Sequence, residues 1–300
     1  YIEEAPVVSQ LTHPGPTFGN FDNFAGYTPA RDSVLSLVEV GNGEGPVNGS
    51  GYYPSYEQYI LALDKGWHIA PTNNQDNHKG KWGDANTARD VIVTDDFTEA
   101  GLYHAMSERR VYATEDQNLR IYYYLNDVLM GGVVPVEDEQ TIEKVTIKAS
   151  ISDPDKEGLG KIEVIGENGL TKYSVDVAGA TYELKVELDN TDAYYYIRVT
   201  EADGDIAVTS PVWVGEATPI TAEASTNTYI SIMGEAETVS ATVTNSAEAA
   251  YTVSKVEFTL NAQGKEMVVY TDNTARTIAA GANETVSFDF VPSIEGKQTM

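Results

Sequence analysis

The pattern of apolar residues changes near residue 130, and this change most limits what the chain can fold into. Before it, short apolar runs alternate with segments of helical spacing, which indicates alternating strands and helices. After it come short runs in which Val, Thr, Tyr and Ile alternate with polar residues, separated by Gly, Asp and Asn clusters. The second pattern is typical of immunoglobulin-like β-sandwiches. The chain is therefore expected to combine an α/β part with all-β domains.

Three domains are predicted, which suits a length of 300 residues. Residues 1–132 form the α/β part, and an acidic, proline-containing connector at 134–140 follows it. Residues 133–216 form one immunoglobulin-like sandwich, and residues 217–300 form a second one. We expect the second sandwich to be truncated, because the sequence stops as another strand begins.

The expected elements follow from periodicity and from the residues that start and stop helices. In the α/β part we expect strands at 5–11, 33–40, 67–71 and 91–93, helices at 56–65 and from 95 or 96 to 110, and strands leading out at 111–114 and 119–125. In the first sandwich we expect strands at 144–150, 161–165, 182–188, 194–200 and 206–214. Segment 15–31 is long and rich in Gly, Pro, Phe and Asn, which is typical of functional loops.

Composition excludes several classes of function. The net charge is -27, from 19 basic and 46 acidic residues, so the chain is disfavoured as a partner of nucleic acid. No run of about 18 apolar residues occurs, so no membrane span is expected. Cysteine is absent, so a metal would be held by nitrogen and oxygen ligands. Acidity, lack of cysteine and modular sandwiches favour an extracellular or cell-surface location in a bacterium, with association with the cell wall as a further expectation.

Asp76 and His78 stand two residues apart in a polar loop that follows an apolar run ending at Pro71. A carboxylate and an imidazole at this spacing can bind one metal ion. His13 also follows an apolar run, and Pro14 is expected to hold its backbone extended. Two such sites at strand ends predict a metal centre at the mouth of an α/β sheet or barrel. The alternative is an exposed polar turn at 76–78 and a histidine that only begins a loop.

Glu39 is a carboxylate inside an otherwise apolar strand. Such a group is costly to bury unless it is paired or bound to a metal. Glu39 is therefore a candidate ligand or a support for the ligands, and the alternative is a half-exposed edge strand. His68 and His104 are expected to be structural or surface histidines.

Five short motifs, in order, resemble the C-terminal half of the polymerase-and-histidinol-phosphatase (PHP) family of metal-dependent phosphoesterases, in its CehA/McbA-like branch. They are T-H-P-G at 12–15, L-V-E-V-G-N-G at 37–43, A-L-D-K-G-W at 62–67 leading to D-N-H at 76–78, R-V-Y-A-T at 110–114, and L-N-D at 125–127 with M-G at 130–131. The resemblance covers about residues 1 to 132.

The resemblance implies a distorted (β/α)₇ barrel with two or three Zn, Mn or Fe ions at the carboxyl ends of its strands. By resemblance, His13 corresponds to a late histidine ligand, and Asp76 and His78 correspond to the terminal D-x-H ligands. Glu39 matches no ligand position. The family's opening H-x-H pair and its other early ligands would lie upstream of Tyr1, so the missing N-terminal part of the barrel is an implied partner of this chain.

The function implied for the intact parent protein is metal-dependent hydrolysis of the phosphoesterase class. A metal-activated water would attack a small-molecule phosphoester or related ester, with His13, Asp76 and His78 as ligands and His13 or His78 moving a proton. The alternative is a non-catalytic cell-surface protein for adhesion or carbohydrate binding with a degenerate barrel. Bound metal at these residues would distinguish the two.

Overall fold

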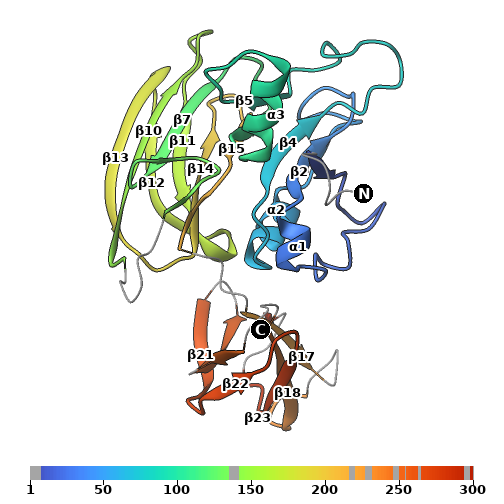
Figure 1. Cartoon of the computed structure of the whole chain (residues 1–300), viewed down its shortest axis with the longest axis vertical. Helices are drawn as coiled ribbons and strands as arrows, with labels where there is room; N and C mark the ends of the chain where they lie inside the picture. The colour runs from blue at the N-terminus through green and yellow to red at the C-terminus, as the bar shows by residue number, and fades with distance from the viewer. Residues whose placement is uncertain are drawn as a thin grey trace. The chain divides into compact units, whose positions relative to one another are not determined.

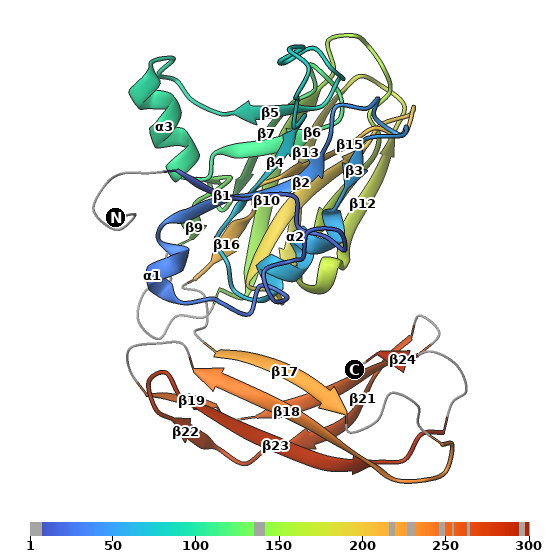
Figure 2. The ribbon, with the colours of Figure 1, turned by 90° about the vertical axis from the view of Figure 1, so that its right-hand side faces the viewer.

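The computed structural model describes residues 8–134, 142–215, 220–226, 232–245, 250–253, 255–262, 265–293 and 298–299. Their regular secondary structure is mainly β-strand, in several sheets, as expected of β-sandwich domains (Figures 1 and 2). The chain divides into two compact units, Tyr1–Ala217 and Thr218–Met300. The predicted connector at 134–140 lies almost wholly outside the described residues. In the described part of the chain, no helix has the length and apolar character needed to cross a membrane.

The first unit begins with a small, mainly parallel sheet. Its strands are β1 (Ser9–Leu11), β2 (Leu35–Asn42), β3 (Tyr53–Pro54) and β4 (Ala70–Asn74). Strand β2 pairs in parallel with both β1 and β4, and its end pairs antiparallel with β3. The connections carry helices α1 (Pro29–Asp32) and α2 (Tyr56–Asp64). The strand predicted at 67–71 begins later in the structure, at Ala70. Trp67 lies before the strand and is buried in the core.

Helix α2 joins this sheet to the rest of the unit. Tyr59, Ala62 and Leu63 recur at helical spacing and are fully buried. The helix ends before Gly66, whose φ of 90° suits the left-handed position that closes many helices. The ring of Tyr59 lies 5.6 Å from that of Tyr196, so the buried face of α2 packs on the sandwich.

The remainder of the first unit is a β-sandwich, seen at the left of Figure 1. One sheet has the order β13 (Thr181–Asp189), β10 (Lys144–Ser152), β7 (Arg120–Leu125), β8 (Val128–Leu129). The other has the order β12 (Thr171–Val177), β11 (Gly160–Ile165), β14 (Tyr194–Thr200), β15 (Ile206–Thr209), β6 (Val111–Thr114), β5 (Arg89–Ile92), with β16 (Val212–Val214) on β14 and β9 (Val133–Val134) on β16. Helix α3 (Glu99–Ser107) lies between β5 and β6 in the chain, and a short 3₁₀ turn, η1 (Glu167–Gly169), follows β11. Burial alternates along β7 and β10, as in strands with one face on a core.

The domain boundary predicted at 132/133 differs from what the structure shows. Strand β7 pairs antiparallel with β10, and β6 pairs antiparallel with β15. Both strands were expected only to lead out of the α/β part, yet they supply backbone partners to both sheets of the sandwich. The α/β part and the first sandwich are therefore one unit. The next predicted boundary, which starts a domain at residue 217, differs by one residue from the second unit's start at Thr218.

The implied barrel is replaced in this chain by an open sheet. Among the described residues, β1 pairs with β2 on one side only. The next strand after β4, β5, pairs antiparallel with β6, and helix α3 connects these two strands. In this sheet the parallel strands thus end at β4, and the sheet does not close among the described residues.

The second unit is all-β in its described residues. Its strands form three groups: β17 (Ile220–Thr226), β18 (Glu237–Asn245) and β23 (Asn283–Phe290); β19 (Tyr251–Val253) and β22 (Arg276–Ile278); and β21 (Lys265–Asp272), β20 (Val256–Ala262) and β24 (Gln298–Thr299). Val239, Phe258 and Val286 from different strands share one core. This arrangement is compatible with the β-sandwich predicted for the last part of the chain.

Candidate functional site

A pocket of about 650 Å³ opens where β1, β2 and β4 end. His13, on the segment after β1, lines it, and so do Asp76 and His78, on the loop after β4. All three predicted metal ligands therefore face one cavity, as the parallel strand ends suggested. The turn at 14–18 and the segment at 51–55 form the rest of the rim. Of the long loop at 15–31, only its beginning contributes to the pocket.

Glu39 lies behind the pocket on β2 and is 4% exposed. Its carboxylate accepts the backbone N–H of His13 and the side-chain amides of Asn42, at 3.2 and 3.3 Å, and Asn74, at 2.8 Å. In the described part of the chain no Lys or Arg forms an ion pair with it. Glu39 is thus a buried carboxylate held by neutral donors, and its clearest role in the chain is to position His13.

His13 has a backbone φ of 35°, so the expectation that Pro14 would keep it extended is wrong. The N–H bond to Glu39 holds the chain in this left-handed conformation, which costs free energy for a residue other than glycine. The His13 ring packs on Phe18, with 4.5 Å between ring centroids. Its Nδ1 is buried and has no hydrogen-bond partner among the described residues. An orphaned imidazole nitrogen in a pocket wall is available to a ligand.

Asp76 and His78 lie on the open side of the pocket, with 50% and 78% of their side chains exposed. His78 Nδ1 lies 2.7 Å from the carbonyl oxygen of Asp76 and 3.7 Å from its carboxylate. A carbonyl oxygen only accepts, so Nδ1 carries the proton and Nε2 of the neutral ring is left free. An ion pair between Lys79 and Glu44 ties this loop to the segment after β2.

The donor set suits a borderline divalent metal, but the side chains do not yet converge on one. Imidazole nitrogen and carboxylate oxygen are what a cysteine-free site would use. In the residues that the structure describes, no three His, Asp or Glu side chains are arranged to hold a metal ion. His13, Asp76 and His78 could hold one together only after the exposed loop moves or further ligands are added.

Asp90, at the start of β5, was not predicted as part of this region. Its carboxylate accepts the backbone N–H of Asn73, the residue that precedes Asn74 on β4. Loss of contact with water raises the pKa of Asp90 to about 7, and the charge of Glu39 adds to this effect. The hydrogen bond from the Asn73 N–H acts in the opposite direction. Asp90 is not among the residues that line the pocket. Nothing in the local sequence Arg89-Asp90-Val91 distinguishes this aspartate from others.

Tyr52 and Glu115 make the pocket's inner wall rigid. The Tyr52 hydroxyl donates to Glu115 Oε1 at 2.9 Å and accepts from the Asn73 amide at 2.8 Å. Tyr56 donates to the same carboxylate oxygen at 2.8 Å, and the backbone N–H of Ile206 donates to the other. Burial, more than the neighbouring Glu115, raises the pKa of Tyr52, so its hydroxyl stays protonated.

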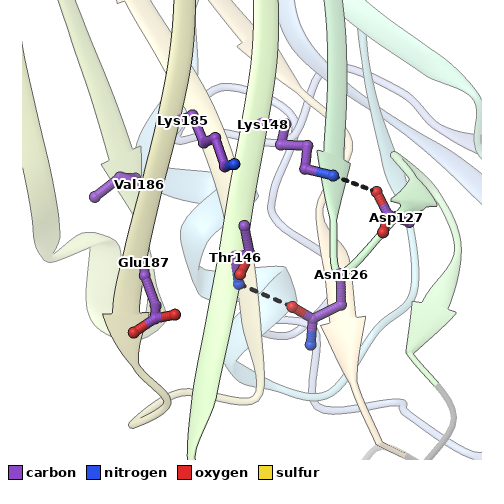
Figure 3. A pocket seen from close by; sticks show the side chains of 7 residues that line it. All are labelled: Asn126, Asp127, Thr146, Lys148, Lys185, Val186 and Glu187. Carbon is purple, nitrogen blue, oxygen red and sulfur yellow. Dashed lines mark hydrogen bonds and ion pairs between the residues drawn. The ribbon is translucent and has the colours of Figure 1, made fainter.

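A second pocket lies on the exposed face of β7, β10 and β13 and has about 580 Å³. Figure 3 shows Lys148 directed at Asp127, to which it is bonded at 2.6 Å, with Lys185 and Glu187 on the neighbouring strand. The Asn126 side chain accepts the N–H of Thr146 in the same view. Its groups are exposed and partly paired with one another, so this hollow is a weaker candidate than the one at the strand ends.

The structure agrees with the structural and surface roles expected of the other two histidines. His68 Nδ1 lies 2.8 Å from Asp32, whose other oxygen accepts the His68 N–H at 2.7 Å. The side chain of His104 is exposed on α3. Neither histidine lines the pocket at the strand ends.

Comparison with known proteins adds little to this geometry. No family model matches the chain, and no curated protein matches it. Among solved structures, the human OSCAR ligand-binding domain has 16% sequence identity, with a match that covers 57% of this chain and 81% of that one. The TM-score is 0.19, which is too low for the match to say anything about the fold or function of this chain.

Proposed function

We propose that this chain belongs to a metal-dependent hydrolase of the phosphoesterase class and carries part of its active site. The proposal rests mainly on one observation: His13, Asp76 and His78, chosen for their chemistry and spacing, line the same pocket at the ends of parallel strands. The PHP-like resemblance of residues 1 to 132 points to the same chemistry. In this proposal, the open sheet β1-β2-β4 is the C-terminal part of a PHP-type barrel.

Each residue has a distinct task in the proposed site. His13 Nδ1 and the free Nε2 of His78 would bind the metal together with the Asp76 carboxylate. Glu39 positions His13 through its backbone N–H, as carboxylates near metal sites position histidine ligands. When bound, a divalent ion lowers the pKa of water and polarises the ester's oxygen.

The proposal requires further ligands and a partner for the free edge of β1. In the described residues β1 has a strand on one side only, which leaves backbone N–H and C=O groups for another strand. An N-terminal part of the barrel, pairing there, would bring the remaining ligands to the pocket. We place the parent protein outside a bacterial cell or at its surface, as the acidity, the sandwiches and the lack of cysteine favour.

The proposal is tested on the intact parent protein by metal analysis and by turnover of phosphomonoester and phosphodiester model substrates. Asp76→Ala and His78→Ala should each lower metal-dependent turnover by about 10- to 100-fold or more. Both residues are exposed and make few contacts, so the thermal unfolding of the sandwich should stay unchanged.

His104→Ala is the matched control, because it removes an exposed histidine from α3, away from the pocket lining. It should leave both metal content and turnover as they are. Full turnover in both Asp76→Ala and His78→Ala would overturn the assignment, and so would a parent protein that binds no metal.

One observation favours a second function, carbohydrate binding at the same pocket. Phe18 and Tyr53 line it and are 72% and 67% exposed, so the pocket presents two aromatic rings to solvent. Aromatic rings of this kind stack on apolar faces of ligands. Retention of the protein on immobilised glycans, without bound metal or turnover, would favour this function over hydrolysis.

A further inference from the structure

Three loops at one end of the first sandwich bring acidic side chains together. They are the β6–β7 loop at 115–119, the β10–β11 loop at 153–159 and the β14–β15 loop at 201–205. The Asn118 amide donates to Asp155 at 2.6 Å and joins the first two loops. The backbone N–H of Ala202 donates to the carbonyl of Gly158 at 2.9 Å and joins the last two. The loops are therefore held side by side.

Gly160 permits the close approach of the second and third loops. A Cβ at this position would lie 2.2 Å from the carbonyl oxygen of Thr200, and its φ is 60°. Both the space and the backbone conformation call for glycine. The approach brings the acidic residues of the two loops near one another: Asp153, Asp155 and Glu157 on one, Glu201, Asp203 and Asp205 on the other.

The carboxylates of these loops have no cationic partner in the described part of the chain. Asp116 and Asp153 are 9% and 3% exposed, and each is held by backbone N–H groups of its own loop. Lys156 is exposed on the second loop, but no ion pair joins it to any of these acids. The charge of Asp203 raises the pKa of Glu157. Burial and then the charge of Asp203 raise the pKa of Asp205 to about 6.

Glu201 is the observation that points to a ligand. It is 4% exposed, and its Oε1 is buried with no hydrogen-bond partner among the described residues. Among the charged groups around it, Asp116 and Asp153 interact with it most strongly. The Asn118 side-chain oxygen is likewise buried and unpartnered. A buried acceptor without a partner can be satisfied by a donor or by a cation.

We propose that these three loops bind a calcium ion through Glu201, Asp116, Asp153 and the side-chain oxygen of Asn118. The candidate ligands are all oxygen atoms, with no imidazole among them, which disfavours zinc and the other nitrogen-seeking metals. They come from three loops in an irregular arrangement, which calcium accepts and magnesium, with its strict octahedron, does not.

Binding has to draw the loops closer together. No three His, Asp or Glu side chains in the described part of the chain now stand where they could hold an ion. Repulsion among the carboxylates opposes such an arrangement until a divalent charge is present. The loop ends of the sandwich should therefore be looser without calcium and more ordered with it.

The test begins with protein from which bound metal has been removed by a chelator. Calcium binding is then measured by titration calorimetry, and the unfolding temperature is measured with and without calcium. At a calcium concentration about 100-fold above Kd, the unfolding temperature of the first unit should rise by about 5 °C or more. Magnesium chloride at the same concentration should give a clearly smaller shift. No calcium binding by calorimetry would overturn the proposal.

Glu201→Gln keeps the shape of the side chain and removes the carboxylate that would bind calcium. Calcium affinity should fall by about tenfold or more. Without calcium this variant should be at least as stable as the parent, because the amide has no charged form that would have to be buried, and this readout separates a lost ligand from a damaged fold. Unchanged calcium affinity in Glu201→Gln would overturn the proposal.

Two control variants complete the experiment. Asp189→Asn removes an exposed acid at the opposite end of β10 and β13 and should leave calcium affinity as it is. Asp76→Ala removes the carboxylate of the strand-end pocket and should also retain the calcium shift. Loss of the shift in Asp76→Ala would place the calcium at that pocket instead and overturn the proposal.

Discussion

Within the first unit, the strands of the sandwich differ from the strand-end pocket and the acidic loops in whether buried polar atoms have partners. Along the sandwich strands the buried polar groups are paired: the Tyr123 hydroxyl donates to the carbonyl of Tyr195 at 2.8 Å, and that of Ser210, just after β15, to Val111 at 2.8 Å. The buried side-chain N and O atoms without a partner in the described residues lie elsewhere. They belong to His13, Asn73, Asn77, Asn118 and Glu201.

This difference indicates which parts of the first unit stabilise the fold and which parts are suited to bind a ligand. The first three of those residues lie in or near the strand-end pocket, and the other two lie in the acidic loops of the sandwich. A buried polar atom without a partner costs free energy, so its persistence at strand ends and loops indicates places where a ligand can satisfy it. The paired and apolar sandwich strands then provide the rigid support.

The largest test of this comparison asks whether the α/β part depends on the sandwich for its stability. Tyr59 is fully buried between them, and its hydroxyl donates to the carbonyl of Thr209 at 3.0 Å. Tyr59→Ala should lower the free energy of unfolding by about 3 to 5 kcal/mol, because it leaves a cavity where α2 packs on β14. Tyr59→Phe, which loses only the hydroxyl, should cost about 1 kcal/mol.

Denaturant unfolding followed by fluorescence and by circular dichroism measures both variants. Tyr103→Ala on α3 is the control, since that ring is 52% exposed. If Tyr59→Ala unfolds the α/β part in a separate, earlier transition and leaves the sandwich at its original midpoint, the two parts are not one cooperative unit.

A smaller effect is expected from Asp90, whose pKa is raised to about 7 in the folded chain. Between pH 4 and pH 7 the folded protein then binds more protons at this group than the unfolded one does, so stability falls as the pH rises. Asp90→Asn should remove this dependence and gain about 1 kcal/mol near pH 7, a figure reduced for solvent screening of a partly exposed side chain.

Urea unfolding of Asp90→Asn and the parent protein at pH 4, 5, 6 and 7 gives the measurement. The difference between them should grow with pH, and Asp189→Asn, an exposed acid on β13, should show no such growth. A constant difference across this range would mean that the pKa of Asp90 is not raised in the folded chain.

Much of the fold could be predicted from local pattern. The predicted limits were within two residues of the observed ones for strands β10, β11 and β14 and for helix α2. Their apolar residues recur with the period of a strand or a helix, and this pattern can be read from a short stretch of sequence. Strand β12 was missed, since most of it is half-buried or exposed and its alternation is weak. The predicted strand at 206–214 is two strands, β15 and β16, divided at Pro211, which lacks the N–H that a ladder needs.

What could not be predicted depends on pairing between distant segments. The sequence of β6 and β7 shows that they are strands, but not that their partners are β15 and β10, and the 132/133 boundary failed for that reason. At the pocket, chemistry and strand-end position pointed to His13, Asp76 and His78, which line it, and their role as ligands stays a prediction. The bond from His13 to Glu39 and the place of Asp90 beside Asn73 required the folded backbone.

The smallest effect is expected for an exposed ion pair on the outer face of the sandwich. Lys148 and Asp127, bonded at 2.6 Å in the hollow of Figure 3, are 43% and 80% exposed. An exposed pair gains little, because water and salt screen it and two long side chains lose freedom. Lys148→Ala should therefore change the free energy of unfolding by less than about 0.5 kcal/mol, with no change in metal content or turnover. A loss well above that, measured by urea unfolding at low and high salt, would show that the outer face of β10 contributes more than its exposed position suggests.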